Sequence, residues 1–290
     1  LCRCTGYRAI GDAIEGRTAD LCDGRQRDPV GRSVPVPDGP AVVSGRAAYT
    51  FDLAVPDLLH LKVLRSPHAH ARIASIDTAP ALALPGVVAV LTHADVPDRL
   101  FSTGRHEIAA DDAADTRILD AVLRFVGQRV AAVVAESEAA AEAGCRAIRV
   151  DYEVLPAVFD PAAALRPDAP LVHAGRERPS GGTEWHDDHP NVAARVDGHV
   201  GDVAAGLAAA DLVYGETFVS QRLQHAHLET HGALGWLDGA GRLVIRSSTQ
   251  VPFLTRDALC GLLDLPRDRV RVLCGRVGGG FGGKQEMLTE

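Results

Sequence analysis

Short runs of alternating apolar and polar residues dominate the chain, and this alternation is the pattern of β-strands with one buried face. The runs that predict strands are Tyr49–Val55, His60–Leu64, Ile73–Ile76, Val87–Leu91, Val130–Val134, Arg149–Val154, Leu212–Val219, Leu234–Leu237, Leu243–Ser247 and Val270–Cys274. Helical patterns predict three helices: Glu138–Ile148 after the capping residue Ser137, Val203–Ala210, and Pro252 to about Leu263. Strands and helices mixed in this order predict an α+β fold.

Breaks in this pattern divide the chain of 290 residues into five parts. Residues 25–40 form a polar linker with several prolines, and residues 161–195 form a second irregular connector. Residues 1–24 precede the linker, residues 41–160 form a mixed unit, and residues 196–290 form the last unit. Because the chain starts without a methionine and stops soon after its last strand, we expect it to be part of a longer polypeptide.

The last predicted strand runs into a glycine-rich turn, Gly278–Lys284, which reads GGGFGGK. Glycine permits positive φ angles and a close approach of the backbone to a ligand. Successive amide groups in such a turn can form a nest for anionic oxygens. Together with the cation of Lys284, the turn predicts contact with a phosphorylated or polyanionic ligand.

Two nucleotide-binding patterns partly match this turn. Gly278, Gly280 and Gly283 have the spacing of the dinucleotide fingerprint, but that motif requires a following helix and a later acidic residue, and the chain ends first. Gly278, Gly283 and Lys284 nearly match a phosphate-binding loop, but Gln285 replaces the required serine or threonine. Nucleotide binding therefore stays an alternative with weak support.

The six cysteines are too scattered for a disulfide scaffold in a chain of this size. Cys2 and Cys4 are close enough to bind one iron–sulfur cluster or metal ion, although they supply only half of a four-thiolate set, and a purely structural role is equally open. The other half would have to precede Leu1. The remaining cysteines need no role beyond packing in helices and strands.

Histidines and carboxylates cluster at two further places. In an extended segment, His225, His227, Glu229 and His231 would share one face, either as metal ligands or as hydrogen-bonded residues that line a polar crevice. The run 186–189, HDDH, lies in the irregular connector, where an exposed loop is the simpler interpretation.

The formal net charge of −8 argues against binding to nucleic acid or to an anionic membrane surface. No run approaches the roughly 18 apolar residues of a membrane span. We expect a cytoplasmic location.

Several of these segments resemble, in the same order, the molybdenum hydroxylases of the xanthine dehydrogenase and aldehyde oxidoreductase family. The N-terminal LCRCTGY resembles the end of that family's [2Fe–2S] helical domain. The segments GRAAYTFDL, RSPHAHARI, DTAPALALPGVVAVLTHADVP and GQRVAAVVAES resemble its a/b hammerhead domain. The run from Gln224 to Glu229, then Ser248–Gln250 and Val277–Lys284, resembles the start of its molybdopterin-binding domain.

The resemblance implies roles for individual residues. Cys2 and Cys4 would bind a [2Fe–2S] cluster. Gln250 would hydrogen-bond the apical oxygen of molybdenum, and Gln285 would face the substrate where typical xanthine dehydrogenases have glutamate, which puts a xanthine substrate in doubt. The residues that would lie against the molybdopterin are Gly279, Gly280, Phe281 and Gly282.

The resemblance also implies an activity and its limits. The parent enzyme would hydroxylate an aldehyde or N-heterocyclic carbon with oxygen from water, and electrons would leave through [2Fe–2S] clusters. The short linker leaves no room for an FAD domain, so flavin would belong to a separate subunit or another acceptor would take the electrons, and the parent would form oligomers. The general base would lie beyond residue 290, so this part alone would be inactive. A non-catalytic binding or assembly role is the alternative.

Overall fold

The computed structural model describes Glu15 and residues 36–103, 114–174, 189–192 and 198–286. Cys2, Cys4 and the segment 186–188 therefore lie outside the described residues. The helices are α2 (Gly39–Val43), α3 (Ala79–Leu82), α4 (Glu138–Ala147), α5 (Val203–Ala209) and α6 (Pro252–Leu263). The strands are β1 (His60–Arg65), β2 (Ala71–Asp77), β3 (Val87–Leu91), β4 (Val122–Leu123), β5 (Arg129–Ala135), β6 (Arg149–Val154), β7 (Ala233–Leu237), β8 (Leu243–Ser247) and β9 (Val270–Leu273). Short 3₁₀ turns are η1 (Thr50–Asp52), η2 (Ala163–Leu165) and η3 (Arg267–Arg269).

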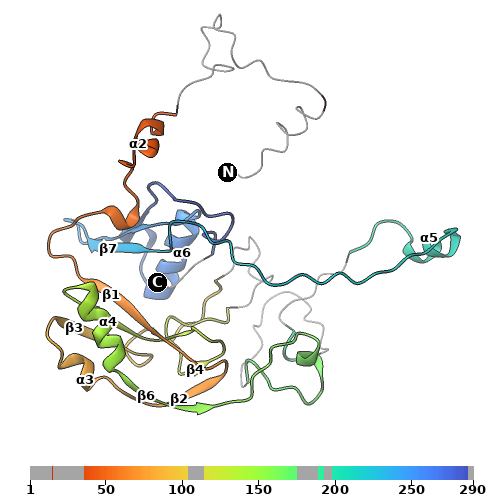
Figure 1. Cartoon of the computed structure of the whole chain (residues 1–290), viewed down its shortest axis with the longest axis horizontal. Helices are drawn as coiled ribbons and strands as arrows, with labels where there is room; N and C mark the ends of the chain where they lie inside the picture. Colours follow the sequence, from red (N-terminus) through yellow and green to blue (C-terminus); the bar gives the residue numbers. More distant parts are fainter. Residues whose placement is uncertain (1–14, 16–35, 104–113, 175–188, 193–197, 287–290) are drawn as a thin grey trace, which may run out of the picture.

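The mixed α+β prediction is confirmed, with the strands arranged in three small sheets. Two antiparallel sheets, with the strand orders β1-β5-β3 and β4-β2-β6, form the lower part of Figure 1. The central strand β5 supplies much of the core, because Val130, Ala131 and Val133 are fully buried. Helix α4 packs closely on this sheet: a Cβ atom at Gly144 would lie 2.7 Å from Cγ1 of Val133.

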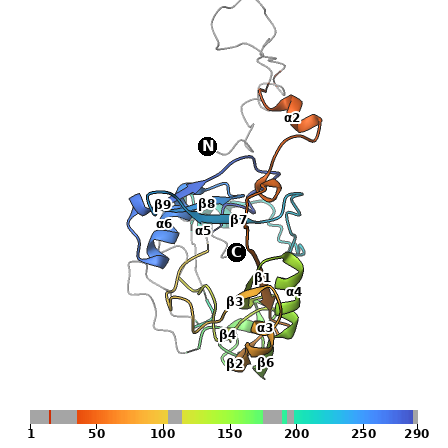
Figure 2. The same cartoon turned by 90° about the vertical axis from the view of Figure 1, so that its left-hand side faces the viewer.

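The third sheet has the order β7-β8-β9 (Figure 2). The glycine-rich turn follows β9, which ends at Leu273. β7 and β8 are antiparallel, whereas β8 and β9 are parallel. A parallel pair needs a crossover connection, and α6 with η3 provides it. α6 ends at Asp264, which has a left-handed φ of 56°, and Pro266 follows as the helix-stop pattern predicts.

Two predicted strands are wrong. The segment 49–55 contains the 3₁₀ turn η1 instead, because the Asp52 carboxylate accepts a hydrogen bond from the Tyr49 amide at 2.8 Å and folds the chain back. The segment 212–219 has no regular structure, and within the described residues no strand pairs with it. Its side chains are of the types that favour strands, but a strand forms only where a neighbouring strand supplies the backbone hydrogen bonds. The segment is part of the long extended stretch between α5 and β7 in Figure 1.

Candidate cofactor-binding site

The glycine-rich turn Gly278–Lys284 is a tight reversal that projects its central residue. The Gly283 amide donates to the Gly280 carbonyl at 2.7 Å, which closes the turn. Gly279 and Gly282 have φ angles of 95° and 89°, and Phe281 between them has a φ of 50°. A positive φ is unfavourable for phenylalanine, and residues held in such conformations cluster at functional sites. The Phe281 side chain is 67% exposed, so the strain is not offset by burial of its ring.

The middle of this turn presents a row of unused hydrogen-bond donors. Hydrogen bonds within the protein hold the amides of Gly278, Gly283 and Lys284, at the two ends of the turn. Between them, the amides of the range 279–282 have no hydrogen-bond acceptor among the described residues. Such adjacent donors suit the oxygens of an anionic or polar ligand. These four residues are also those that the family resemblance assigns to the cofactor.

Gln250 forms the wall behind this row of amides. It follows β8, and its backbone amide donates to the Lys284 carbonyl at 2.9 Å. Its side-chain Oε1 accepts from the Lys284 amide at 3.3 Å. A Cβ atom at Gly280 would lie 2.4 Å from that Oε1, so a side chain there would displace the Gln250 carboxamide. The carboxamide therefore lies directly against the turn, as a cofactor-facing role requires.

Lys284 does not serve the ligand, contrary to the prediction from its position after the glycines. Its side chain is buried, and its ammonium group donates to Glu229 Oε2 at 2.9 Å and to Ser248 Oγ at 2.6 Å. A phosphate-binding loop needs its lysine to reach the phosphates. The buried ion pair with Glu229 keeps the Lys284 ammonium away from any phosphate bound at the turn. The interpretation of the turn as a nucleotide phosphate-binding loop therefore loses its main support.

Glu229 accepts hydrogen bonds from four directions. Burial alone would raise its pKa, but hydrogen bonds from the Ser248 hydroxyl, the Gly278 amide, the Lys284 ammonium and the Thr50 amide outweigh burial and lower the pKa to about 2. The carboxylate is thus ionised throughout the physiological range. Sequence reasoning placed Glu229 among possible metal ligands and did not connect it with Lys284, since 55 residues separate them.

Acid should therefore weaken this part of the fold in a defined pH window. Because the folded pKa of Glu229 is depressed below its ordinary value of 4.5, its stabilising contribution is complete above about pH 5 and is lost as the pH falls toward 2. The shift corresponds to about 3 kcal/mol of unfolding free energy. Urea unfolding between pH 7 and pH 3 covers about 2 kcal/mol of this loss, because the folded pKa lies below that range, and Glu229→Gln should reduce the acid dependence by about 2 kcal/mol. Equal acid dependence in both proteins would contradict the assignment.

The histidines near Glu229 are hydrogen-bonded, which supports the crevice-lining alternative over the metal site. The Nδ1 atom of His227 lies 2.6 Å from the Glu229 carbonyl, and Nε2 of His231 lies 2.9 Å from the Gly283 carbonyl. A left-handed φ of 51° at Ala226 breaks the alternation that a common face would need. No group of three or more metal-binding side chains occurs within the described ranges.

Of the other predicted site residues, Gln285 lies just past the turn, half-buried, with its amide donating to the Gly282 carbonyl at 3.1 Å. It therefore shares the rim of the site with Phe281. Ser248, which sequence reasoning quoted only as part of a motif, joins the Glu229 carboxylate to Lys284. Its position directly after β8 and two residues before Gln250 was the only signal for this role.

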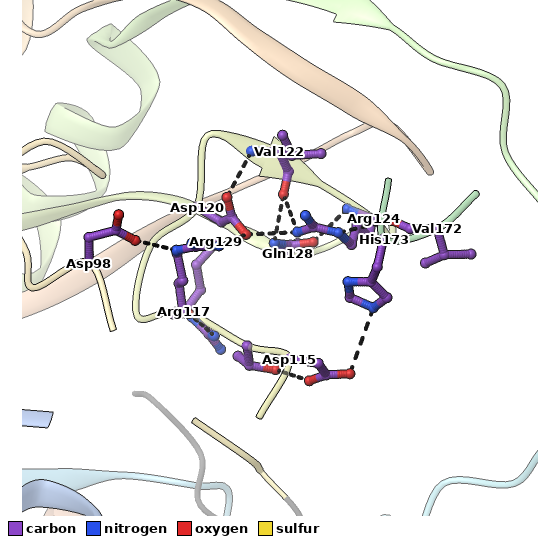
Figure 3. Close-up of polar contacts among 11 residues, drawn as sticks. Asp98, Asp115, Arg117, Asp120, Val122, Arg124, Gln128, Arg129, Val172 and His173 are labelled. Atoms are coloured by element: carbon purple, nitrogen blue, oxygen red, sulfur yellow. Dashed lines mark hydrogen bonds and ion pairs between the residues drawn. The ribbon is translucent and has the colours of Figure 1, made fainter. Parts of the chain in front are cut away.

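A second polar cluster lies in the hammerhead part of the fold and is drawn in Figure 3. Asp120 is buried and accepts from Arg124 at 2.7 Å, while Arg117 pairs with Asp98. Arg124 also donates to the Val172 carbonyl at 3.0 Å, which ties the connector to this unit. The charges of this cluster neutralise one another, so we assign it a structural role.

Comparison with known protein families assigns both halves of the chain. Residues 44–156 match the aldehyde oxidase and xanthine dehydrogenase a/b hammerhead domain, and residues 185–290 match the molybdopterin cofactor-binding domain. The chain belongs to the xanthine dehydrogenase and aldehyde oxidoreductase family. The glycine-rich turn, Gln250 and Glu229 all lie in its molybdopterin-binding domain.

Individual relatives agree with this assignment. The chain is 38% identical over 284 residues to a probable hypoxanthine oxidase of Escherichia coli O157:H7, covering 90% of this chain and 30% of that protein. It is 32% identical over 249 residues to the nicotinate dehydrogenase large molybdopterin subunit of Eubacterium barkeri, covering 86% of this chain and 54% of the relative.

Solved structures of the family have the same fold. Quinoline 2-oxidoreductase from Pseudomonas putida 86 matches with a TM-score of 0.74 and 34% identity, over 87% of this chain and 31% of that one. The aldehyde oxidoreductase from Desulfovibrio desulfuricans matches with a TM-score of 0.76 and 27% identity, over 98% and 32%. The chain therefore spans about a third of the length of most of these family members.

In the part of the chain that the structure describes, no helix is long and apolar enough to cross a membrane.

Proposed function

We propose that this chain is the part of a molybdenum hydroxylase that receives one side of the molybdopterin cofactor. The observation that carries the proposal is the row of amides at 279–282, which find no acceptor among the described residues and are backed by the Gln250 carboxamide. Adjacent hydrogen-bond donors fit the oxygens of such a cofactor, and the site needs no metal ligand from this chain. The molybdenum centre, when bound, would supply the redox chemistry of carbon hydroxylation.

The residues of this chain would bind the cofactor and orient it and the substrate. The amides of Gly279–Gly282 would donate hydrogen bonds to the cofactor, and Gln250 would fix its position from the side of β8. The exposed ring of Phe281 would cover the site and exclude water, and Gln285 at the rim would meet the substrate. A neutral amide there favours an uncharged substrate such as an aldehyde or a neutral N-heterocycle.

Other parts of the proposal concern the rest of the enzyme. We propose that Cys2 and Cys4 bind a [2Fe–2S] cluster, that residues 1–24 end its domain, and that residues 25–40 and 161–195 connect the domains. Units at 41–160 and 196–290 agree in outline with the two family matches. One relative is a xanthine dehydrogenase molybdenum-binding subunit, which supports assembly with a separate FAD subunit or another electron acceptor. We propose a cytoplasmic enzyme.

Metal analysis of a matched pair of variants tests the proposal. We expect the full-length protein that contains this chain to hold near-stoichiometric molybdenum and to hold iron. Gly280→Ala should lower its molybdenum content at least ~10-fold, because the new Cβ would strike Gln250 Oε1. Gly239→Ala is the control, since a Cβ there meets no atom within 4 Å. Mass spectrometry of the metals and fluorescence of the oxidised pterin measure the outcome.

Each alternative has its own result in this experiment. Absence of molybdenum from the unaltered protein would exclude the proposal and favour a binding or assembly role. Molybdenum without iron would exclude only the assignment of Cys2 and Cys4. Equal molybdenum in the two glycine variants would remove the turn from the site.

A further inference from the structure

The glycine-rich turn is anchored at both ends by one carboxylate. At its first residue, the Gly278 amide donates to Glu229 Oε2 at 2.6 Å, and the Glu229 amide donates back to the Gly278 carbonyl at 3.1 Å. At its last residue, the Lys284 ammonium reaches the same Oε2 at 2.9 Å. Ser248 completes the arrangement, because its hydroxyl donates to Glu229 at 2.6 Å and accepts from Lys284. We call Glu229, Ser248 and Lys284 the Glu229 clamp.

The clamp fixes the ends of the turn and leaves its middle open. The side chains of Glu229 and Lys284 are 8% and 0% exposed, so water does not compete for these hydrogen bonds. The ring of Phe281, halfway between the anchored ends, is 67% exposed. A short loop whose ends share one acceptor is strongly restricted in the shapes it can take. The positive φ of Phe281, and the amides that have no acceptor among the described residues, lie between these two held ends.

A third segment meets the same carboxylate. The Thr50 amide donates to Glu229 Oε1 at 3.4 Å, and a Cβ atom at Gly278 would lie 3.3 Å from the Tyr49 ring. Arg276, which precedes the turn, lies over the Tyr49 ring and pairs with Asp38 at 2.9 Å. The stretch 38–52 precedes β1, the first strand of the hammerhead domain, so the clamp joins this leading segment to the glycine-rich turn.

We propose that Glu229 is a positioning residue that holds the glycine-rich turn in its cofactor-receiving shape and couples this shape to the segment 38–52 that precedes β1. Glu229 does not itself touch the cofactor; it acts through Gly278 and Lys284. The identification of the ligand as molybdopterin rests on the proposed function. The coupling between the turn and the leading segment, in contrast, is a property of the protein without any ligand.

Hydrogen exchange of the full-length protein without cofactor tests the coupling directly. In Glu229→Gln, the neutral amide cannot balance the buried ammonium of Lys284, and it cannot serve four donors. We expect exchange of the hydrogen-bonded turn amides, those of Gly278 and of the range 283–285, to accelerate about 100-fold. Exchange in residues 48–52 should accelerate with it, while β5 stays protected. The matched control is Glu153→Gln, which removes an exposed partner of Arg72 and should leave all these segments unchanged.

Ser248→Ala is the second variant, for the case in which Glu229→Gln unfolds the whole protein. It removes the two hydrogen bonds of the Ser248 hydroxyl from the clamp and keeps both charges, so we expect about a tenfold acceleration confined to the same two segments. Ser247→Ala is its control, because the Ser247 hydroxyl has no hydrogen-bond partner among the described residues. Wild-type exchange in the turn of Ser248→Ala, or acceleration in the turn without the leading segment, would overturn the proposal.

Cofactor content then links the clamp to the site. Protein produced with a molybdenum supply should contain at least ~10-fold less pterin in Glu229→Gln than in Glu153→Gln. Unchanged pterin in a loosened turn would overturn the positioning role. If the unaltered protein holds no pterin, the proposed function fails, and the exchange experiment still decides whether the clamp couples the two segments.

Discussion

Replacing Lys284 by glutamine is expected to lower the free energy of unfolding by about 3–5 kcal/mol, because the change leaves the Glu229 carboxylate buried without a counter-charge. The Lys284 side chain is fully buried, and its two partners, Glu229 and Ser248, lie on different segments of the chain. Glutamine has a shorter side chain than lysine and carries no charge, so it cannot balance the carboxylate. Urea unfolding followed by far-ultraviolet circular dichroism measures the loss.

Lys62, the other lysine of the chain, provides the control for this prediction. Lys62 also pairs with a glutamate, Glu138, but both side chains are exposed, at 36% and 62%. Exposed ion pairs contribute little because water screens them and two long side chains must be ordered. Lys62→Gln should therefore unfold close to the wild-type midpoint. Similar losses in the two variants would mean that burial does not govern the Lys284 pair. Acetylation of accessible amines should likewise modify Lys62 and spare Lys284.

Leu123→Ala is expected to destabilise the hammerhead domain by about 2–5 kcal/mol through the cavity that it creates. Leu123 is fully buried and packs with Ile73 and Val130, which link the two antiparallel sheets. Its strand β4 has only two residues, so little backbone pairing holds this place if the side chain is lost. Thermal unfolding of the purified protein measures the effect.

An exposed leucine of the same domain calibrates the Leu123 measurement. Leu61 on β1 is 50% exposed, and Leu61→Ala leaves no enclosed cavity. Its effect should be well under half that of Leu123→Ala. If the two variants lose equal stability, the core of this domain lies elsewhere than between these two sheets.

Most of the regular structure was predictable from local pattern, for reasons that particular elements illustrate. α4 begins after Ser137, whose hydroxyl accepts from the Ala140 amide, and it ends before a strand, as the sequence indicates. β6 has the predicted bounds Arg149–Val154. These signals depend on hydrogen bonds and burial within a few residues, and neighbouring residues in the sequence are sufficient to specify them.

The two failed strands show where local pattern stops being sufficient. The segment 212–219 has the composition of a strand, yet a strand requires a partner, and the described part of the chain offers none. At 49–55, one carboxylate, that of Asp52, turns the chain before a strand can form. Conversely, β4 is too short to show any periodicity, although Leu123 is among the most deeply buried side chains.

By itself, the sequence determined the mixed fold, the position of the glycine-rich turn and, through the order of its segments, the enzyme family. Glycine spacing and residue order are properties of the chain, and they do not depend on which distant groups meet. Only the tertiary structure decided what each residue of the turn does. It buried Lys284 against Glu229 and Ser248, assigned His227 and His231 to hydrogen bonds, and gave the amides of Gly279–Gly282 no acceptor within the described part of the chain. The physical reason is that desolvation and pairing of charges depend on contacts between segments that folding alone brings together.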